Sequence, residues 1–246
     1  MKSPFSKAFE EHTINTWSDR SKINQVESYL LSNYFKDKNT SILDAGTGNG
    51  VFSFYLEKEL GFQNISAFDI IPKMIERAKK NATEKTSNVN FFVADAAQLH
   101  DVKSNQFGYL CYLQQVLSMV PEHSLNAALK EAHRIGNEHS TYLFSFLDWH
   151  SRWYNPILSL NINTVRLLKG KPVQKRYLPE LKFNGKLNKQ FYKSDQHAML
   201  WAKKRDILKT LNNTGFEVKT VYKEKMITNK KGSALFFVCT KKQEIY

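Results

Sequence analysis

The chain has 246 residues, of which 41% are hydrophobic and 24% charged, a composition that is ordinary for a globular protein. Its longest apolar runs, such as ALFFVC at 234–239, are far shorter than the roughly 20 residues that cross a bilayer, which excludes a membrane-spanning class. The net charge of +13 is unevenly distributed along the chain. Residues 1–150 contain 15 Lys/Arg and 17 Asp/Glu, whereas residues 151–246 contain 21 Lys/Arg and 6 Asp/Glu. Such a basic half is typical of a solvated surface, or of binding to an acidic substrate, nucleic acid or anionic lipid.

The predicted elements alternate from residue 41 onwards, after a helical segment over residues 1–40. Pro72 stands near the first turn of a predicted helix, where its missing N–H costs nothing. Short apolar strands that alternate with helices predict a mostly parallel sheet with helices on both faces. We expect strands at 41–45, 65–70, 89–95, 107–113 and 140–147, and helices at 51–60, 72–85 and 121–135.

The second part of the chain departs from this alternation. Residues 148–193 form a basic segment that is rich in aromatic residues and that we predict to be irregular. A helix followed by a turn is predicted at 196–216, and two strands at 217–227 and 233–242 are predicted to form a hairpin through a tight link. We expect a single domain with an N-terminal helical cap (1–40), a core (41–147 and 194–246) and an insertion (148–193).

Three of the ten glycines lie within five positions, in the run ILDAGTGNG at 42–50. Glycines placed between a strand and a helix permit a tight turn and the close approach of a ligand to the backbone. The dinucleotide pattern G-x-G-x-x-G fails because position 51 is Val51, and no Lys-Ser/Thr pair follows as in a P-loop. The pattern that remains is D-x-G-x-G-x-G.

Three motifs in this order resemble the class I S-adenosylmethionine-dependent methyltransferases. They are LDAGTGNG, AFDIIPKMIERAKKNA and NFFVADAAQL, and the resemblance covers residues 41–147 and the C-terminal hairpin. It implies a Rossmann-like methyltransferase fold of the α/β class, with a mostly parallel seven-stranded sheet, helices on both faces and a C-terminal antiparallel hairpin.

The resemblance implies S-adenosylmethionine as cofactor and S-adenosylhomocysteine as product. Asp69 would accept hydrogen bonds from the two ribose hydroxyls, and Asp95 with Ala96 would lie beside the adenine. Asp44 would bind either the loop backbone or the ammonium group of the ligand. The expected cofactor-binding residues are Asp44, Gly46, Thr47, Gly48, Gly50, Asp69, Ile70, Asp95, Ala96 and Gln114.

The acceptor side is expected at the end of the fourth strand and in the insertion, which would lie over the acceptor site. In YLQQVLSMVP (112–121), Gln114 and Gln115 would face the ligands, and Leu117, Met119 and Val120 would wall the site. The expected substrate-binding residues are Gln115, Trp149, Arg176 and Tyr177, and the candidate general bases are His150, Tyr154 and His197. No Cys/His cluster has metal-ligand spacing, so we expect no metal.

Three functions are compatible with these motifs. The first is methyl transfer to an O or N atom of a small, acidic molecule. The second is an RNA methyltransferase that holds phosphates with the basic C-terminal half, and the third is a non-catalytic protein that binds S-adenosylmethionine or a partner. The Asn/Asp-Pro-Pro-aromatic motif of amino-methylating DNA enzymes is absent, which argues against methylation of a base amino group or a glutamine amide.

The N-terminus lacks the apolar region of a signal peptide. Cys111 and Cys239 both lie in apolar runs and are expected to be buried free thiols rather than a disulfide. We therefore expect a cytoplasmic protein with no membrane partner.

Overall fold

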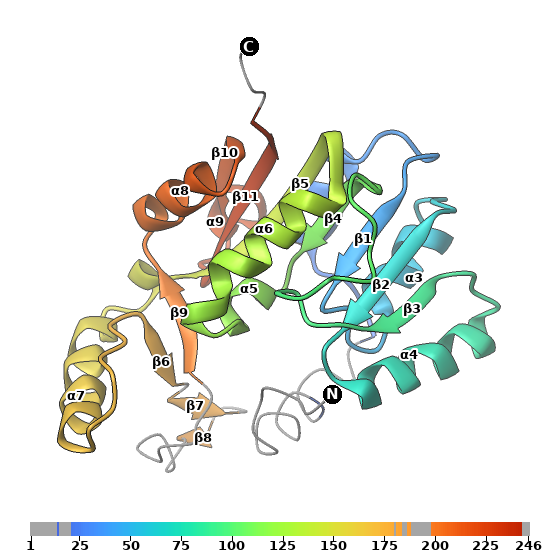
Figure 1. Cartoon of the computed structure of the whole chain (residues 1–246). Helices are drawn as coiled ribbons and strands as arrows, with labels where there is room; N and C mark the ends of the chain where they lie inside the picture. The colour runs from blue at the N-terminus through green and yellow to red at the C-terminus, as the bar shows by residue number, and fades with distance from the viewer. Residues whose placement is uncertain (1–13, 15–20, 180, 184–185, 188–197, 243–246) are drawn as a thin grey trace.

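The computed structural model describes residues 14, 21–179, 181–183, 186–187 and 198–242. Its centre is a sheet in which seven strands follow the order β10-β11-β5-β4-β1-β2-β3, as Figure 1 shows. The first five strands of the chain pair in parallel, and β11 is antiparallel to both of its neighbours, β5 and β10. The bounds are β1 Ile42–Ala45, β2 Ile65–Asp69, β3 Asn90–Val93, β4 Phe107–Tyr112, β5 Gly136–Asp148, β10 Phe216–Lys223 and β11 Ala234–Lys241.

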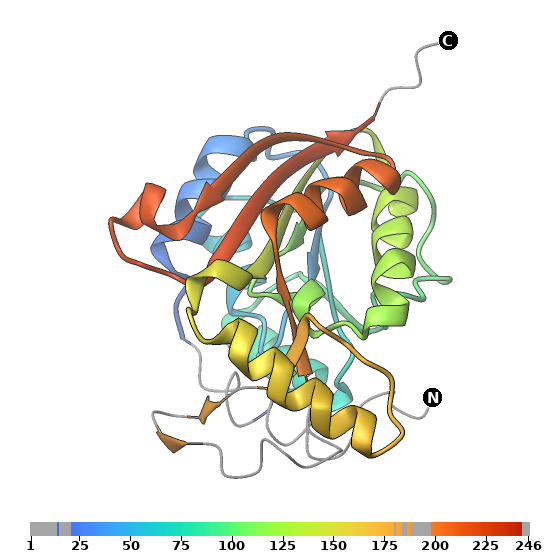
Figure 2. The same cartoon turned by 90° about the vertical axis from the view of Figure 1, so that its left-hand side faces the viewer.

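Helices cover both faces of this sheet, which is seen from a second side in Figure 2. Alternate strand residues explain the two layers: Leu110 and Tyr112 belong to one apolar cluster with α6 and α8, whereas Cys111 lies in the other with α2, α3 and α4. The expected Rossmann-like α/β fold is confirmed. The helices are α2 Gln25–Tyr34, α3 Val51–Lys58, α4 Pro72–Lys85, α5 Val116–Met119, α6 Leu125–Ile135 and α8 Lys204–Asn213, and a 3₁₀ turn, η1, spans Glu122–Ser124.

The insertion contains a regular helix, which corrects the expectation of an irregular segment. A 3₁₀ turn, η2 (Trp149–Ser151), leads into α7 (Asn155–Leu168), and a short strand β6 (Tyr177–Pro179) follows. Two further short strands, β7 (Lys182–Phe183) and β8 (Lys186–Leu187), pair with each other.

Residues 198–202 were expected to be helical but form strand β9 (Ala198–Ala202). This strand pairs antiparallel with β6 and parallel with the end of β5, where Leu147 is opposite Trp201. Leu147 is also paired with Ala234 of β11, so β9 lies on the β4 side of β5, beyond the end of β4. The insertion is thereby anchored to the sheet at its carboxyl edge.

The C-terminal hairpin is confirmed, although its link is longer than expected. A short helix, α9 (Glu224–Thr228), stands between β10 and β11. Both cysteines are free and buried, as expected. Within the described ranges, no helix has the length and apolar character needed to cross a membrane.

Candidate active site

The loop between β1 and α3 holds its three glycines in the left-handed region, with φ of +67° at Gly46, +58° at Gly48 and +88° at Gly50. Side chains adopt this conformation only with strain. A Cβ at Gly46 would lie 2.4 Å from Cγ2 of Val116. A Cβ at Gly48 would meet Cε of Met74 at 3.5 Å, an ordinary contact, so a ligand has room to approach the backbone there.

Asp44 supports this loop from beneath. Its Oδ2 accepts hydrogen bonds from Thr47 Oγ1 at 2.7 Å and from Ser53 Oγ at 2.6 Å. The side chain is buried and does not line the cavity described below. These hydrogen-bond partners are side-chain hydroxyls of the loop and of α3, whereas the loop backbone and the ammonium group of the ligand were the two partners expected for Asp44.

Asp69, at the end of β2, contacts the glycine loop directly. Its Oδ2 accepts from the Gly48 N–H at 2.9 Å, and its Oδ1 accepts from the Ile71 N–H at 2.9 Å. Burial raises the pKa of the Asp69 carboxyl above its ordinary value, and hydrogen bonds from backbone N–H groups oppose the rise. An ionised carboxylate accepts about four hydrogen bonds, so Asp69 keeps acceptor capacity for a ligand beyond the bonds from the N–H groups of Gly48, Ile71 and Ile70.

Asp95 follows β3 on the same edge of the sheet. The Ala94 N–H donates to the Asp69 carbonyl at 3.1 Å, which ties the end of β3 to the end of β2. Asp95 Oδ1 accepts from the Ala97 N–H at 2.9 Å, so the turn after the strand is fixed by its own aspartate. Asp95 and Ala96 both line the cavity.

Gln114 and Gln115 follow β4 in an unusual backbone conformation, with φ of +57° and +62°. The Gln115 N–H donates to Ser145 Oγ at 2.9 Å, which holds this turn against β5. Left-handed backbone at two successive residues other than glycine is uncommon and concentrates at ligand sites. The turn places Gln114 in the wall of the cavity.

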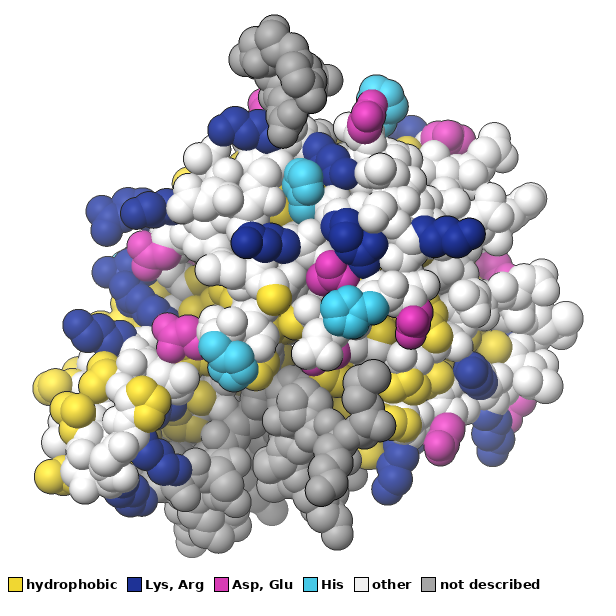
Figure 3. Space-filling view, viewed as in Figure 1, with side chains coloured by type: hydrophobic (Ala, Val, Ile, Leu, Met, Phe, Trp, Pro, Cys, Tyr) yellow, Lys and Arg dark blue, Asp and Glu magenta, His cyan; other side chains and the backbone are white. Residues whose placement is uncertain are grey.

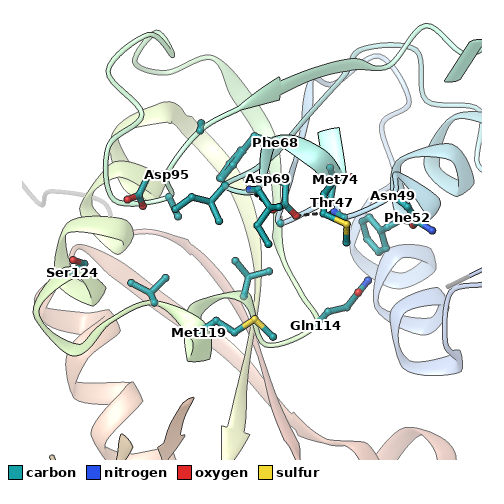
Figure 4. A pocket seen from close by; sticks show the side chains of 18 of the residues that line it. Thr47, Asn49, Phe52, Phe68, Asp69, Met74, Asp95, Gln114, Met119 and Ser124 are labelled. Carbon is teal, nitrogen blue, oxygen red and sulfur yellow. Dashed lines mark hydrogen bonds between the residues drawn. The ribbon is translucent and has the colours of Figure 1, made fainter. Parts of the chain in front are cut away.

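These segments enclose one cavity at the carboxyl edge of the parallel strands (Figure 4), where open α/β sheets bind ligands. Of the ten expected cofactor residues, the cavity contains Gly46, Thr47, Gly48, Asp69, Ile70, Asp95, Ala96 and Gln114. Asp44 and Gly50 lie behind it. Its further lining is Asn49, Val51, Phe52, Phe68, Ile71, Met74, Ala94, Val116, Met119, Val120, Pro121, His123 and Ser124.

Several of these residues were not anticipated from the sequence. Met119 and Val120 line the cavity as expected, but Leu117 points into the core and is fully buried. His123 and Ser124 enter from η1, a segment that was expected to be part of a longer helix. Pro121 directly precedes η1, and it is the residue in the sequence that could have indicated that the regular helix does not begin there.

A second cavity shares Gln114 with the first. It lies between the start of α2, the Gln114–Gln115 turn and the α9 region. Both positively and negatively charged residues line this cavity. The lining residues are Lys22, Asn24, Gln25, Val26, Glu27, Gln114, Gln115, Glu224, Thr228, Lys230, Ala234 and Phe236.

Three of the expected substrate-binding residues lie outside both cavities. The Arg176 guanidinium lies 4.2 Å from the ring centre of Trp149, and its Nη2 is 3.6 Å from Asp206 Oδ2. Tyr177 is buried and donates its hydroxyl to the Val120 carbonyl at 3.2 Å. Arg176 thus has an aromatic and an acidic neighbour, and its contact with an acceptor stays a prediction. Gln115 alone of this group lines a cavity.

The candidate bases are not gathered at the cavities. The side chain of His150 is exposed, and Tyr154 packs edge-on against Trp153. Neither lines a cavity described above. His197 lies outside the described residues. Among the residues that the structure describes, no group of three or more His, Cys, Asp or Glu could hold a metal ion.

Comparison with known proteins agrees with this geometry. Residues 42–138 match the family model of a methyltransferase domain. The release factor glutamine methyltransferase of Flavobacterium psychrophilum is 26% identical over 137 residues, which cover 54% of this chain and 45% of that protein. The chain thus spans less than half the length of this relative.

Solved structures share the fold. An S-adenosylmethionine-dependent methyltransferase from Methanosarcina mazei superposes with a TM-score of 0.66 at 17% identity, over 87% of this chain and 98% of that one. A 1,6-didemethyltoxoflavin-N1-methyltransferase from Burkholderia thailandensis, with S-adenosylhomocysteine bound, superposes with a TM-score of 0.63 at 13% identity. The superposition covers 96% of this chain and 85% of that one.

The residues present fit an adenosyl cofactor. Gly48 lines the cavity, the Asp69 carboxylate keeps acceptor capacity for a ligand hydroxyl, and apolar side chains such as Met119 and Val120 form a wall. Residues 42–138 therefore form a methyltransferase domain, and the chain shares the fold of S-adenosylmethionine-dependent methyltransferases.

Proposed function

We propose that the protein transfers a methyl group from S-adenosylmethionine to a polar small molecule that occupies the second cavity. The observation that carries the proposal is that Gln114 lines both cavities. A donor in one cavity and an acceptor in the other would meet at this residue. Positioning of this kind supplies a large part of the acceleration of a bimolecular step.

The bound cofactor supplies a methyl group on a positively charged sulfur. The chain contributes position and exclusion of water. The glycine loop and Asp69 hold the nucleoside end, and Val116 and Met119 cover the space between the loop and Gln114. An apolar wall removes water from an attacking O or N atom, which strengthens its reactivity toward a cationic centre.

The chemistry of the second cavity supports a polar acceptor. Lys22 and Lys230 are positive, and Glu27 and Glu224 are negative. Such a lining suits a molecule with both donor and acceptor groups better than a simple anion. The small, acidic molecule expected from the sequence depended on Arg176, which lies elsewhere.

Glutamine methylation, the activity named for the Flavobacterium relative, is less well supported. The chain has Gln-Gln-Val-Leu at 114–117, where an Asn/Asp-Pro-Pro-aromatic motif would be expected for an amide acceptor. RNA methylation depends on basic residues of the C-terminal half. Of these, Arg152 and Arg176 lie against the rings of Trp201 and Trp149, which reduces their availability for phosphate.

A labelling experiment separates these acceptors. The purified protein is incubated with S-adenosylmethionine carrying a labelled methyl group and with small-molecule, RNA or protein fractions of cells. Transfer to the small-molecule fraction is expected. Label that enters RNA and is released by nuclease, or label that enters protein, would contradict the proposed acceptor class but not the methyltransferase itself.

A further inference from the structure

Helix α7 exposes apolar side chains where a surface helix normally exposes charge. The exposed fractions are 56% for Ile157, 70% for Leu160, 62% for Leu167 and 83% for Leu168, and Trp153, which precedes the helix, is 82% exposed. Pro156, Asn161 and Thr164 complete the exposed side of the helix. This face, from Trp153 to Leu168, therefore contains no exposed charged residue.

The inward face of α7 is fixed by polar contacts, so the helix cannot rotate to bury its apolar side. Asn155 donates to the Trp149 carbonyl at 2.9 Å, and Ser159 Oγ donates to the Lys175 carbonyl at 2.8 Å. Asn163 Oδ1 accepts from the Gln174 N–H at 2.8 Å. Each of the three side chains is buried, and rotation would leave buried polar groups without partners.

The chain around this face is positively charged. Residues 149–179 contain six Lys or Arg and no Asp or Glu. Lys169, Lys171 and Lys175 are exposed just after the helix. Figure 3 shows the hydrophobic side chains gathered over α7 at the lower left, with Lys and Arg side chains beside them.

We propose that the α7 face is a docking surface for an anionic lipid bilayer. Exposed leucines with an indole at one end and lysines alongside are the features of helices that lie in the membrane interface. A helix of 14 residues is about 21 Å long at 1.5 Å per residue, which suits lying on a bilayer rather than crossing it.

Charge argues for lipid over a second copy of this chain. A two-fold dimer through α7 would bring the same lysine-rich surfaces together, whereas an anionic membrane attracts each lysine. No membrane partner was expected from the short apolar runs and the polar N-terminus, which carry no information on an exposed apolar face of α7.

Vesicle sedimentation tests the proposal with the full chain. Vesicles of phosphatidylcholine alone are compared with vesicles that also contain phosphatidylserine. We expect binding to the mixed vesicles, weakened by salt, and at least about tenfold weaker partitioning for Leu160→Glu, since one buried leucine side chain contributes that much. The triple change Lys169→Gln, Lys171→Gln and Lys175→Gln should remove the preference for the anionic lipid.

Met226→Glu is the matched control, because Met226 is 66% exposed on α9 rather than on α7. It should bind as the unchanged protein does, and thermal unfolding should show all variants folded. Failure to bind anionic vesicles, or equal binding by Leu160→Glu, would overturn the proposal. So would a dimer in solution that Leu160→Glu dissociates, since that would assign the face to a second copy.

Discussion

The Asp69 carboxylate accepts a hydrogen bond from the Gly48 backbone at 2.9 Å, which links the end of β2 to the middle of the glycine loop. The same carboxylate lines the cavity. One side chain therefore shapes the loop and faces the ligand, so its substitution affects both.

Gly46→Ala should destabilise the protein more than Gly61→Ala does. Both glycines have positive φ, but a Cβ at Gly46 would lie 2.4 Å from Val116 Cγ2, whereas a Cβ at Gly61 meets nothing within 4 Å. The shared backbone strain is about 1–2 kcal/mol, and the overlap adds about 1–3 kcal/mol. Denaturant unfolding measures the difference, and Val116→Ala should restore part of it in the double variant. Equal losses for the two glycines would contradict the packing at Gly46.

Ser53→Ala should lower the free energy of unfolding by about 1–3 kcal/mol, because the buried Asp44 carboxylate loses a donor. Thr83, whose exposed hydroxyl bonds the Lys79 carbonyl at 3.2 Å, provides a control: Thr83→Ala should change stability little. Cofactor affinity, measured by calorimetry, should fall much less for Ser53→Ala than for a change at Asp69. A larger loss of affinity than of stability would place Asp44 at the ligand instead.

Cofactor affinity should fall at acidic pH, with a midpoint above the ordinary aspartate value of 3.8. The ionised carboxylate accepts more hydrogen bonds than the neutral acid, and burial raises the pKa of Asp69. The pH dependence of stability without cofactor is opposite to that of cofactor affinity. The folded state binds the Asp69 proton more tightly than the unfolded state does, so the contribution of Asp69 to the free energy of unfolding declines as pH rises through its folded pKa. Titrations at several pH values with Asp69→Asn as reference measure the effect. A midpoint that persists in Asp69→Asn would assign it to another group.

Lys230→Gln should reduce kcat/KM for the acceptor several-fold and leave cofactor affinity unchanged. Lys230 lines the second cavity, whereas its neighbour Lys231 does not, so Lys231→Gln is the matched control. This prediction depends on the proposed acceptor site. Steady-state kinetics in which both variants behave alike would place the acceptor elsewhere.

The sequence was sufficient to predict the parallel sheet and most of the cofactor cavity, because strong local signals coincide there. Helix α4 begins at Pro72 and ends at Lys85 as predicted. The strand ends at Asp69 and Asp95 converge because the carboxyl ends of parallel strands meet at one edge.

Sequence-based prediction failed where contacts between distant residues decide the structure, and where a helix departs from the usual pattern of an apolar buried side and a polar exposed side. The run AMLWA at 198–202 has helix-forming residues, but pairing with β5 and β6 makes it a strand. Helix α7 was missed because apolar side chains lie on both its buried and its exposed sides, and polar side chains such as Asn155 and Asn163 are buried. The role of Arg176 could not be predicted because Trp149 and Asp206 are distant in sequence.

Calorimetric titration of S-adenosylmethionine tests the central claim, that the glycine-loop cavity is the cofactor site, most directly. The unchanged protein should bind, and Asp69→Asn should weaken binding by about 1.5–3 kcal/mol, the contribution of hydrogen bonds to a charged group. Thermal unfolding of Asp69→Asn verifies that the variant is folded. Unchanged affinity in a folded Asp69→Asn protein, or binding of NADH or ATP in preference to S-adenosylmethionine, would contradict the account.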